Sequence, residues 1–244
     1  MRYKLSAPAT LHTTIQLPAS KSISNRALIL HALAQGHIAP SNLSDCDDTR
    51  VMIKALDGNP GHIDILAAGT AMRFLTAYLS VTPGTRIITG TERMQQRPIR
   101  ILVDALRELG AQIEYAGKEG FPPLRITGTE LTGEEISLAG NVSSQYISAL
   151  LMIGPILKNG LRLNLTGEII SRPYINLTLQ LMKEFGADAA WSSESSITVR
   201  PGKYRDIPFT VESDWSGASY WYQMVALIQD NEKKESTKTE IKLP

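Results

Sequence analysis

The stretch 141–167 reads NVSSQYISALLMIGPILKNGLRLNLTG, and an earlier stretch, 67–90, reads AAGTAMRFLTAYLSVTPGTRIITG. Each is followed by an Arg-Pro pair, a long apolar-periodic segment and a glycine. The landmarks keep a nearly constant separation: 76 residues for Gly84 and Gly160 and for Gly110 and Gly186, 77 for Gly90 and Gly167, and 75 for the Arg-Pro pairs at 97–98 and 172–173. Such steady spacing indicates an internal repeat.

Each repeat reads as loop, helix, strand, helix, strand, strand. Arg73–Leu79 and Tyr146–Met152 are apolar on more than one face, which predicts buried helices. Ile99–Leu109 and Ile175–Phe185 carry apolar residues at helical spacing and are each closed by a glycine, which predicts amphipathic helices. The segments Arg86–Ile88 and Leu161–Leu165 are predicted as strands.

A third, incomplete copy opens the chain. The sequence PASKSISNRALILHALAQGHIAPSNL, which starts at Pro18, and the following CDDTRVMIKALDG match the front of the unit. Only Asn59–Ile65 separates this copy from the next, so its closing strands are missing from the sequence pattern. At the other end, Gln229–Leu243 is rich in charge and is either a solvated tail or an element without its partner.

Composition, net charge and cysteine content argue against several classes of function. The 244 residues are 43% hydrophobic, and 25 Lys and Arg against 24 Asp and Glu give a net charge of +1. Such a balance provides no general basic field of the kind that nucleic-acid binders carry, so we expect no nucleic-acid partner. Cys46 is the single cysteine, which excludes an internal disulfide. The N-terminal segment lacks the apolar core of a signal peptide, and no apolar run reaches about 18 residues, so we expect a cytoplasmic mixed α/β protein with no signal peptide and no membrane association.

The front of each unit carries small hydroxyl residues or glycine immediately before an apolar helix. These are Ser22 and Ser24, then Gly69 and Thr70, then Ser143 and Ser144. One such residue is an ordinary helix cap. Three sets at equivalent repeat positions, around a pseudo-threefold axis, would point three helix N-termini toward one region and form a site for multiply charged anions.

Cations accompany these helix starts. They are Lys21, Arg26, Arg73, Arg97 and Arg172. A lone surface arginine is usually solvated or paired, but arginine beside serine hydroxyls and helix N-termini suits phosphate and carboxylate. A metal site is disfavoured, because the four histidines have no partner at ligand spacing. The acidic residues Asp45, Asp47 and Asp48 flank Cys46, and a helix cap before Thr49–Leu56 is a better interpretation than a metal loop.

The motifs LPASKSISNRALIL, AAGTAMR, ERMQQRPI, PPLRITG, VSSQYISALLM and SRPYINLTLQLMKEFG closely resemble those of the 3-phosphoshikimate 1-carboxyvinyltransferase family, also called EPSP synthases. The resemblance runs from about Leu5 to about Tyr222. The sister enolpyruvyl transferase of cell-wall synthesis shares the repeat but is less similar at SKSISNR and SSQ.

The resemblance implies an α/β (α+β) fold in which three βαβαββ-type repeats form one domain of a two-domain inside-out α/β barrel. It implies a first strand at 1–17 that belongs to the second domain, a complete substrate-binding domain at 18–212, and a return crossing with the start of the second domain at 213–244. It also implies a monomer that transfers the carboxyvinyl group of phosphoenolpyruvate to the 5-hydroxyl of shikimate 3-phosphate and releases phosphate, with no metal or organic cofactor.

The resemblance also implies roles for residues at matching positions. Lys21 would lie between the two substrates and Arg97 would hold phosphoenolpyruvate, and these two are the expected catalytic residues. Gly69 and Thr70 would form the wall beside phosphoenolpyruvate, and Gln145 would bridge the ligands. The expected shikimate 3-phosphate ligands are Ser22, Arg26, Ser143, Ser144, Ser171 and Tyr174.

The chain departs from the family pattern at three points. Ala67 stands where asparagine is common, Phe74 stands where proline is common, and family members are considerably longer. We therefore expect a fragment that binds substrate weakly and turns over little. The alternatives are a UDP-N-acetylglucosamine enolpyruvyl transferase, a non-catalytic phosphometabolite-binding module and, disfavoured by the neutral charge, an RNA-binding repeat protein.

Overall fold

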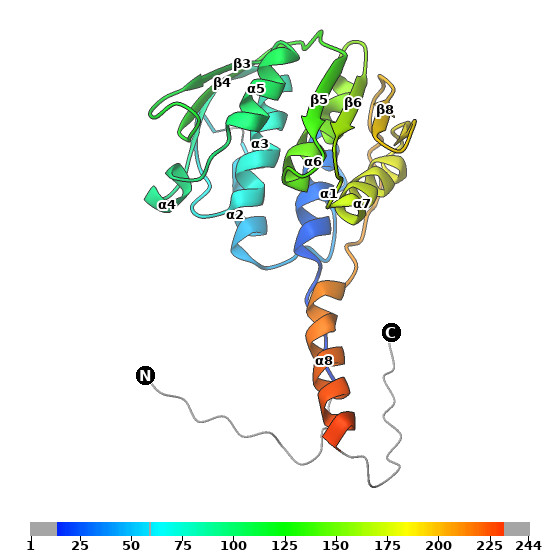
Figure 1. Ribbon diagram of the computed structural model, residues 1–244. Coiled ribbons are helices and arrows are strands. Elements are labelled where there is room, and N and C mark those ends of the chain that lie inside the picture. The colour runs from blue at the N-terminus through cyan, green and yellow to red at the C-terminus, as the bar shows by residue number, and fades with distance from the viewer. Residues whose placement is uncertain (1–13, 59, 232–244) are drawn as a thin grey trace. The chain divides into compact units, whose positions relative to one another are not determined.

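The computed structural model describes residues 14–58 and 60–231. Contacts between residues divide the chain into two units. One unit is Ala19–Glu212, and the other combines Met1–Pro18 with Ser213–Pro244. The larger unit contains the repeats and is described first (Figure 1).

A four-stranded mixed sheet forms the middle repeat. Its strands, in the order β1-β2-β4-β3, are β1 (His62–Asp64), β2 (Gly84–Thr89), β4 (Leu124–Gly128) and β3 (Gln112–Tyr115). β1 and β2 are parallel, and the other neighbours are antiparallel. The helices of this repeat are α3 (Gly69–Val81), the short α4 (Glu92–Gln95) and α5 (Arg100–Glu108).

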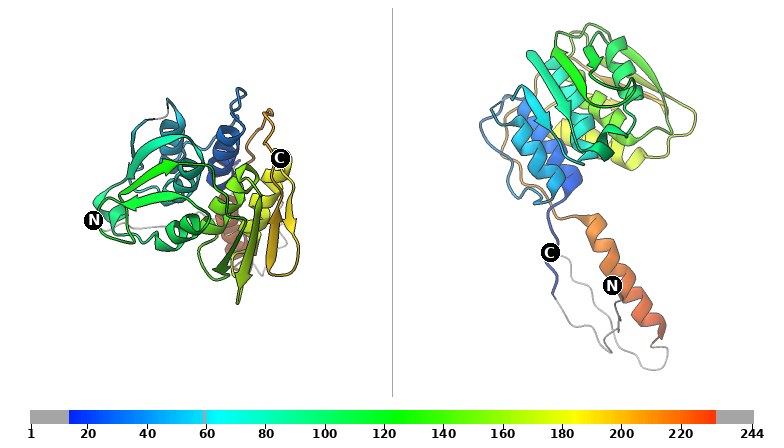
Figure 2. Two further views of the ribbon diagram at one scale, coloured as in Figure 1. Left: turned by 90° about the horizontal axis from the view of Figure 1, so that it is seen from above. Right: turned by 90° about the vertical axis from the view of Figure 1, so that its left-hand side faces the viewer.

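The last repeat builds a second sheet with the same order and the same strand directions. Its strands, in the order β5-β6-β8-β7, are β5 (Glu135–Ala139), β6 (Leu161–Thr166), β8 (Ser196–Val199) and β7 (Ala189–Trp191). Its helices are α6 (Ser144–Ile153), the 3₁₀ turn η1 (Gly154–Ile156) and α7 (Arg172–Glu184). The left-hand view of Figure 2 shows from above that the two sheets are separate.

The identical topology confirms the repeat for these two units. Each unit opens with a strand, β1 or β5, as the βαβαββ repeat implied by the resemblance requires, although the local sequence pattern indicates a loop there. Both strands alternate buried and exposed residues but are short, and β1 has only one buried position, Ile63. Such a pattern becomes a strand only because a parallel neighbour, β2 or β6, supplies hydrogen-bond partners.

The incomplete first repeat consists of α1 (Lys21–Leu33) and α2 (Asp47–Leu56). A distant segment takes the place of its missing strands. Ser41 forms a parallel bridge with Thr210, and the Asn42 side chain donates to the Val211 carbonyl at 2.6 Å. The Asp206 carboxylate accepts from the His37 backbone N–H at 2.7 Å. The segment 206–211 therefore satisfies backbone groups that a sheet would otherwise satisfy.

The first helices of the three repeats, α1, α3 and α6, pack against one another at the centre of the unit (Figure 1). Their side chains are buried almost all round, and Ile29, Leu75 and Leu150 are each fully buried. α5 packs on α3, and α7 packs on α6, with one buried face each. The sequence-based division into fully buried and amphipathic helices is confirmed.

The two outer helices end in the same way. Gly110 and Gly186 have positive φ values of 104° and 90°. In α5 the Gly110 N–H donates to Arg107 and the Ala111 N–H donates to Leu106, and α7 repeats the pattern. This paired arrangement is the Schellman motif, which favours glycine at that turn because a Cβ is strained at positive φ.

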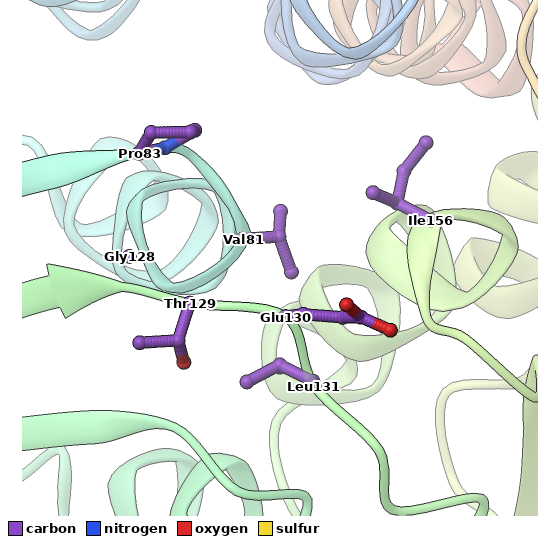
Figure 3. Close-up of a pocket in the computed structure, with 7 residues that line it drawn as sticks. All are labelled: Val81, Pro83, Gly128, Thr129, Glu130, Leu131 and Ile156. Carbon is purple, nitrogen blue, oxygen red and sulfur yellow. The ribbon is translucent and has the colours of Figure 1, made fainter.

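At the C-terminal end of α3 a surface cleft of about 360 Å³ is lined by Val81, Pro83, Gly128, Thr129, Glu130, Leu131 and Ile156 (Figure 3). Because α3 begins at Gly69, this cleft lies at the other end of the helix from the predicted anion site.

In the smaller unit, α8 (Trp215–Asn231) follows Asp214, whose backbone N–H donates to the Pro18 carbonyl at 2.8 Å. Of the first strand expected at 1–17, residues 1–13 lie outside the described residues, as do residues 232–244 of the polar C-terminal segment. Within the described ranges, no helix has both the length and the apolarity needed to cross a bilayer.

Candidate anion-binding site at three helix starts

The start of α1 is capped by Ser20, not by Ser22 or Ser24. The Ser20 hydroxyl accepts from the Ile23 backbone N–H at 3.4 Å. Ser24 is fully buried, donates to the Ser20 carbonyl at 2.8 Å and accepts from the Ser44 backbone N–H at 2.9 Å. Ser20 takes the cap because its backbone is extended, whereas Ser22 already lies inside the first turn.

The other two helix starts differ in their caps. The N-cap of α6 is Ser143, which accepts from the Gln145 backbone N–H at 3.3 Å. The N-cap of α3 is Ala68, which has no side-chain acceptor, and Gly69 and Thr70 form the first turn. At the start of α3, therefore, no N-cap side chain accepts from the first backbone N–H groups, so these donors are the most available to a ligand.

Arg26 joins α1 to the helices around it. Its guanidinium donates to the Ser22 carbonyl at 2.9 Å, to the Ser148 hydroxyl of α6 at 3.0 Å and to the Thr178 hydroxyl of α7 at 2.8 Å. The residue is only 3% exposed. Burial lowers the pKa of Arg26 to about 10, an effect that the phenol of Tyr174 partly opposes. At neutral pH the side chain therefore keeps its charge.

These contacts also align the central helices. Arg26 is the sixth residue of α1, Phe74 is the sixth of α3 and Ser148 is the fifth of α6. Arg26 contacts the other two at this level, through the Phe74 ring and the Ser148 hydroxyl. Since all three helices reach one point after about one and a half turns, their N-termini lie at one end of the bundle.

Two arginines lie against Gly69. A Cβ at this glycine would stand 2.5 Å from Nη1 of Arg97 and 2.6 Å from Nη1 of Arg73. Arg73 is 6% exposed and donates to the Gly69 carbonyl at 2.7 Å. Burial lowers the pKa of Arg73, and the nearby charge of Arg97 lowers it further. Two cations held together at a helix start form an arrangement suited to an anion.

The starts of α3 and α6 are linked directly. The Gln145 side-chain amide donates to the Thr70 hydroxyl at 3.2 Å. The Tyr146 hydroxyl donates to the Pro98 carbonyl at 2.9 Å, which ties the residue after Arg97 to α6. Gln145 therefore lies between the α3 start and Ser143 and Ser144.

The start of α7 contributes Ser171 and Tyr174. Ser171 is the N-cap residue but its side chain makes no capping hydrogen bond, and Tyr174 is 47% exposed. Arg172, the repeat counterpart of Arg97, differs from it. The Arg172 guanidinium stacks on Trp191 at 4.2 Å from the ring centroid and donates to the Glu194 carbonyl. Of the two Arg-Pro arginines, only Arg97 reaches the central helix starts.

Lys21 forms an ion pair with Asp48 of α2 at 3.0 Å. Asp47 and Asp48 lie in the first turn of α2, as the cap interpretation predicts, although the N-cap itself is Cys46 and makes no side-chain capping bond. The sequence pattern missed the link to Lys21, because 27 residues separate the partners and no local spacing connects them. Asp48 has a second carboxylate oxygen, which is buried without a hydrogen-bond partner.

Acidic partners are otherwise scarce at these helix starts. Among the described residues, no carboxylate forms an ion pair with Arg26, Arg73 or Arg97. Within the same ranges, no group of three or more His, Cys, Asp or Glu side chains could hold a metal ion. The site is therefore a set of cations, hydroxyls and helix N-termini whose charge the described protein leaves largely uncompensated.

Ala67 and Phe74, the two residues at which the resemblance implies a departure from the family pattern, flank this site. Ala67 is exposed and follows Leu66, whose φ of 52° places a leucine in the left-handed region. Phe74 is 1% exposed and faces Arg26.

Comparisons with known proteins identify the family of this chain. The model of the family EPSP synthase (3-phosphoshikimate 1-carboxyvinyltransferase) matches residues 5–58 and 59–236. A 3-phosphoshikimate 1-carboxyvinyltransferase of Bacteroides fragilis is 76% identical over 227 residues, which cover 93% of this chain and 55% of that protein. One from Shewanella halifaxensis is 41% identical over 249 residues, covering 91% and 58%.

Solved structures give the same fold. An EPSP synthase structure from Acinetobacter baumannii superposes with a TM-score of 0.73 at 24% identity, over 85% of this chain and 51% of that one. The expected fold class is thereby confirmed. The chain spans about half the length of the curated relatives it matches. Because the family model covers nearly the whole sequence, the chain belongs to the EPSP synthase (3-phosphoshikimate 1-carboxyvinyltransferase) family.

Proposed function

We propose that this chain provides the shikimate 3-phosphate site, and part of the phosphoenolpyruvate site, of a 3-phosphoshikimate 1-carboxyvinyltransferase. The observation that carries the proposal is the group of three arginines, Arg26, Arg73 and Arg97, at convergent helix starts without carboxylate partners among the described residues. Such uncompensated charge is costly unless an anion binds there.

The shikimate 3-phosphate side comprises α1, α6 and α7. Ser143 and Ser144 at the α6 start hold the phosphate, with Ser171 beside them at the α7 start. Ser22 and Arg26 come from α1, and the half-exposed ring of Tyr174 lines the pocket for the sugar acid. Arg26 is too buried to wrap around a ligand, so it acts by its charge and by the few donors left free on its guanidinium.

The phosphoenolpyruvate side is the start of α3. Arg97 supplies an exposed guanidinium, Gly69 lets it approach the helix, and Arg73 adds a second positive charge behind it. Gln145, which already bonds to Thr70, bridges this side to the phosphate side. Lys21 stands between the two ligands and carries the charge nearest the reacting groups.

The reaction is addition of the 5-hydroxyl to phosphoenolpyruvate, followed by elimination of phosphate from the tetrahedral intermediate. Both substrates are multiply charged anions that repel each other, so the first task of the protein is to bring them together. Oriented cations and N–H groups at three helix starts offset that repulsion in both the ground state and the intermediate. No metal or organic cofactor takes part in this scheme.

Calorimetry of the 244-residue chain with shikimate 3-phosphate tests the proposal. We expect a weak exothermic signal that Arg26→Ala and Arg26→Met reduce by about tenfold or more in affinity. Arg107→Met is the matched control, because Arg107 also stacks on an aromatic ring, at 4.9 Å from Tyr115, but lies on the outer helix α5. Equal binding by wild type and both Arg26 variants would contradict the assignment.

UDP-N-acetylglucosamine serves as the comparison ligand, and tighter binding of it than of shikimate 3-phosphate would favour the sister transferase. A single-chain turnover close to that of the longer relatives would contradict our expectation that the isolated chain turns over little. The monomeric state and the cytoplasmic location implied by the resemblance stay predictions, which size-exclusion chromatography and cell fractionation can check.

A further inference from the structure

The Arg26 guanidinium lies over the aromatic ring of Phe74. Cζ of Arg26 is 5.2 Å from the ring centroid, and Phe74 and Arg26 are only 1% and 3% exposed. A cation at this distance from a ring face is attracted by the negative potential of the π system, and the attraction is strongest where water is excluded. This contact joins α3 to α1 at the level where the central helices meet.

Few other groups offset the positive charge of Arg26. Its hydrogen-bond acceptors, the Ser22 carbonyl and the Ser148 and Thr178 hydroxyls, are all neutral. The titratable group that affects Arg26 from α7 is the Tyr174 phenol. Those acceptors lie at the edge of the planar guanidinium, where its N–H groups point. The Phe74 ring supplies a further contact, over which the guanidinium carbon lies.

We infer that Phe74 is a positioning residue for anion binding: its ring holds the charged Arg26 guanidinium beneath the helix starts, in the orientation that a bound phosphometabolite meets. The identity of that ligand rests on the proposed function. Phe74 also lies on the helix that begins with Gly69 and Thr70, so the contact ties the shikimate 3-phosphate side to the phosphoenolpyruvate side.

Simple packing is the competing explanation, since a fully buried phenylalanine fills core volume wherever it lies. The packing and cation–π explanations make different predictions for a Phe74 ring that keeps its shape but loses the negative potential of its face. Only the cation–π explanation predicts weaker ligand binding. Phenylalanines with one, two and three fluorine atoms provide that series. Phe185 is the matched control, because it is also 1% exposed but packs on another ring, that of Phe209 at 5.4 Å.

The first experiment inserts the fluorinated residues singly at position 74 and, separately, at position 185 of the 244-residue chain. Calorimetry then measures the dissociation constant for shikimate 3-phosphate. We expect stepwise weakening at position 74, reaching about tenfold for the trifluorinated ring, and no trend at position 185. A flat series at position 74, with binding intact, would overturn the inference.

The second experiment needs no ligand. Urea unfolding of wild type, Phe74→Leu, Arg26→Met and the double variant forms a cycle that isolates the coupling between the two side chains. We expect the double variant to lose less stability than the two single losses added together. Additive losses would show that the ring and the guanidinium do not interact, and would overturn the inference on that ground.

The two experiments keep the two proposals apart. If the wild-type chain binds no shikimate 3-phosphate, the proposed function fails. The dissociation constant for inorganic phosphate is then measured for the same fluorinated variants. If the cycle shows coupling but neither anion responds to fluorination, Phe74 stabilises the fold only, and its positioning role is rejected. Coupling together with a fluorine-dependent affinity supports it.

Discussion

At the scale of single residues, Arg26 is a buried arginine that forms no ion pair with a carboxylate among the described residues. Its guanidinium donates to three neutral oxygens and lies over the Phe74 ring. Arg73 repeats the arrangement, since it donates to the Gly69 carbonyl and lies over the Tyr146 ring, and Arg97 lies beside it at Gly69. Cations that neutral groups hold in place in this way suit preorganised binding of an anion.

Gly69 permits the two guanidiniums to approach the α3 start. In Gly69→Ala the new Cβ would meet the ends of both side chains, at 2.5 and 2.6 Å, and the more exposed Arg97 would move first. We expect phosphoenolpyruvate binding to weaken by about tenfold while the free energy of unfolding changes by less than about 1 kcal/mol. Calorimetry and urea unfolding check both parts. Unchanged phosphoenolpyruvate binding would mean that Arg97 does not need this approach.

Leu66 holds a left-handed backbone, with φ of 52°, and half of its side chain is exposed. A leucine in this region is strained by about 1–2 kcal/mol, of which the extra chain entropy of glycine would cancel part. We expect Leu66→Gly to stabilise the protein by about 0.5–1 kcal/mol in urea unfolding. Ala67→Gly is the control, since Ala67 has no positive φ, and it should destabilise. The opposite order would show that the Leu66 side chain outweighs the strain.

At the scale of elements, the equivalent helices α5 and α7 both end in a Schellman motif, but the free space around the terminal glycine differs between them. A Cβ on Gly110 would come no closer than 3.9 Å to its nearest neighbour, the Thr132 backbone nitrogen, whereas one on Gly186 would collide with the Arg205 side chain. Alanine at either position would therefore strain the backbone, but only at Gly186 would it also clash with a side chain.

We expect Gly110→Ala to lower the free energy of unfolding by about 1–2 kcal/mol through backbone strain alone. Gly186→Ala should cost more, because Arg205 must also move. Denaturant titration of both variants gives the ranking. An equal or smaller loss at Gly186 would indicate that Arg205 moves aside without cost.

The segment that replaces the missing strands of the first repeat depends on Asp206. Hydrogen bonds from the backbone N–H of His37 and then Ile38, with His31 and His37 as neighbouring charges, hold the pKa of Asp206 below its ordinary value of 3.8. A carboxyl whose folded-state pKa is depressed contributes stability above its unfolded pKa and loses it as pH falls through the folded one.

We therefore expect Asp206→Asn to be less stable than wild type above about pH 4, and the difference to shrink as the pH falls below 3.8. Urea midpoints measured from pH 6 down to about pH 2.5 test this window. A difference that stays constant over that range would mean that Asp206 contributes through its shape, not through its charge.

At the scale of the whole molecule, a nearly neutral chain concentrates its charge locally. The net charge of +1 hides a cluster of cations at one end of three packed helices. The chain also spans only about half the length of its curated relatives, so further catalytic groups are to be expected in the part of those proteins that it does not match.

We expect carboxyvinyl transfer to appear when the 244-residue chain is mixed with a separately produced polypeptide that corresponds to the unmatched part of the Bacteroides fragilis relative. Phosphate release measured with both substrates reports the activity. Arg97→Ala in this chain should abolish the gain, since it removes a cation from the shared site. Equal phosphate release by the chain alone would contradict the expectation.

The sequence pattern alone was sufficient for the repeat, the buried and amphipathic helices and the two glycine-terminated ends, because apolar spacing and glycine conformation act within one or two helical turns. It also predicts an anion site around Lys21, Arg26 and the serines, and this stays a prediction. Three relationships emerged only in the folded chain: Lys21 with Asp48, Arg26 with Phe74, and Ser41 with Thr210. The partners lie 27, 48 and 169 residues apart, and no local periodicity links them. Such contacts arise only when helices and loops pack, because the energy of a buried charge or a bridging strand depends on what the rest of the chain places beside it.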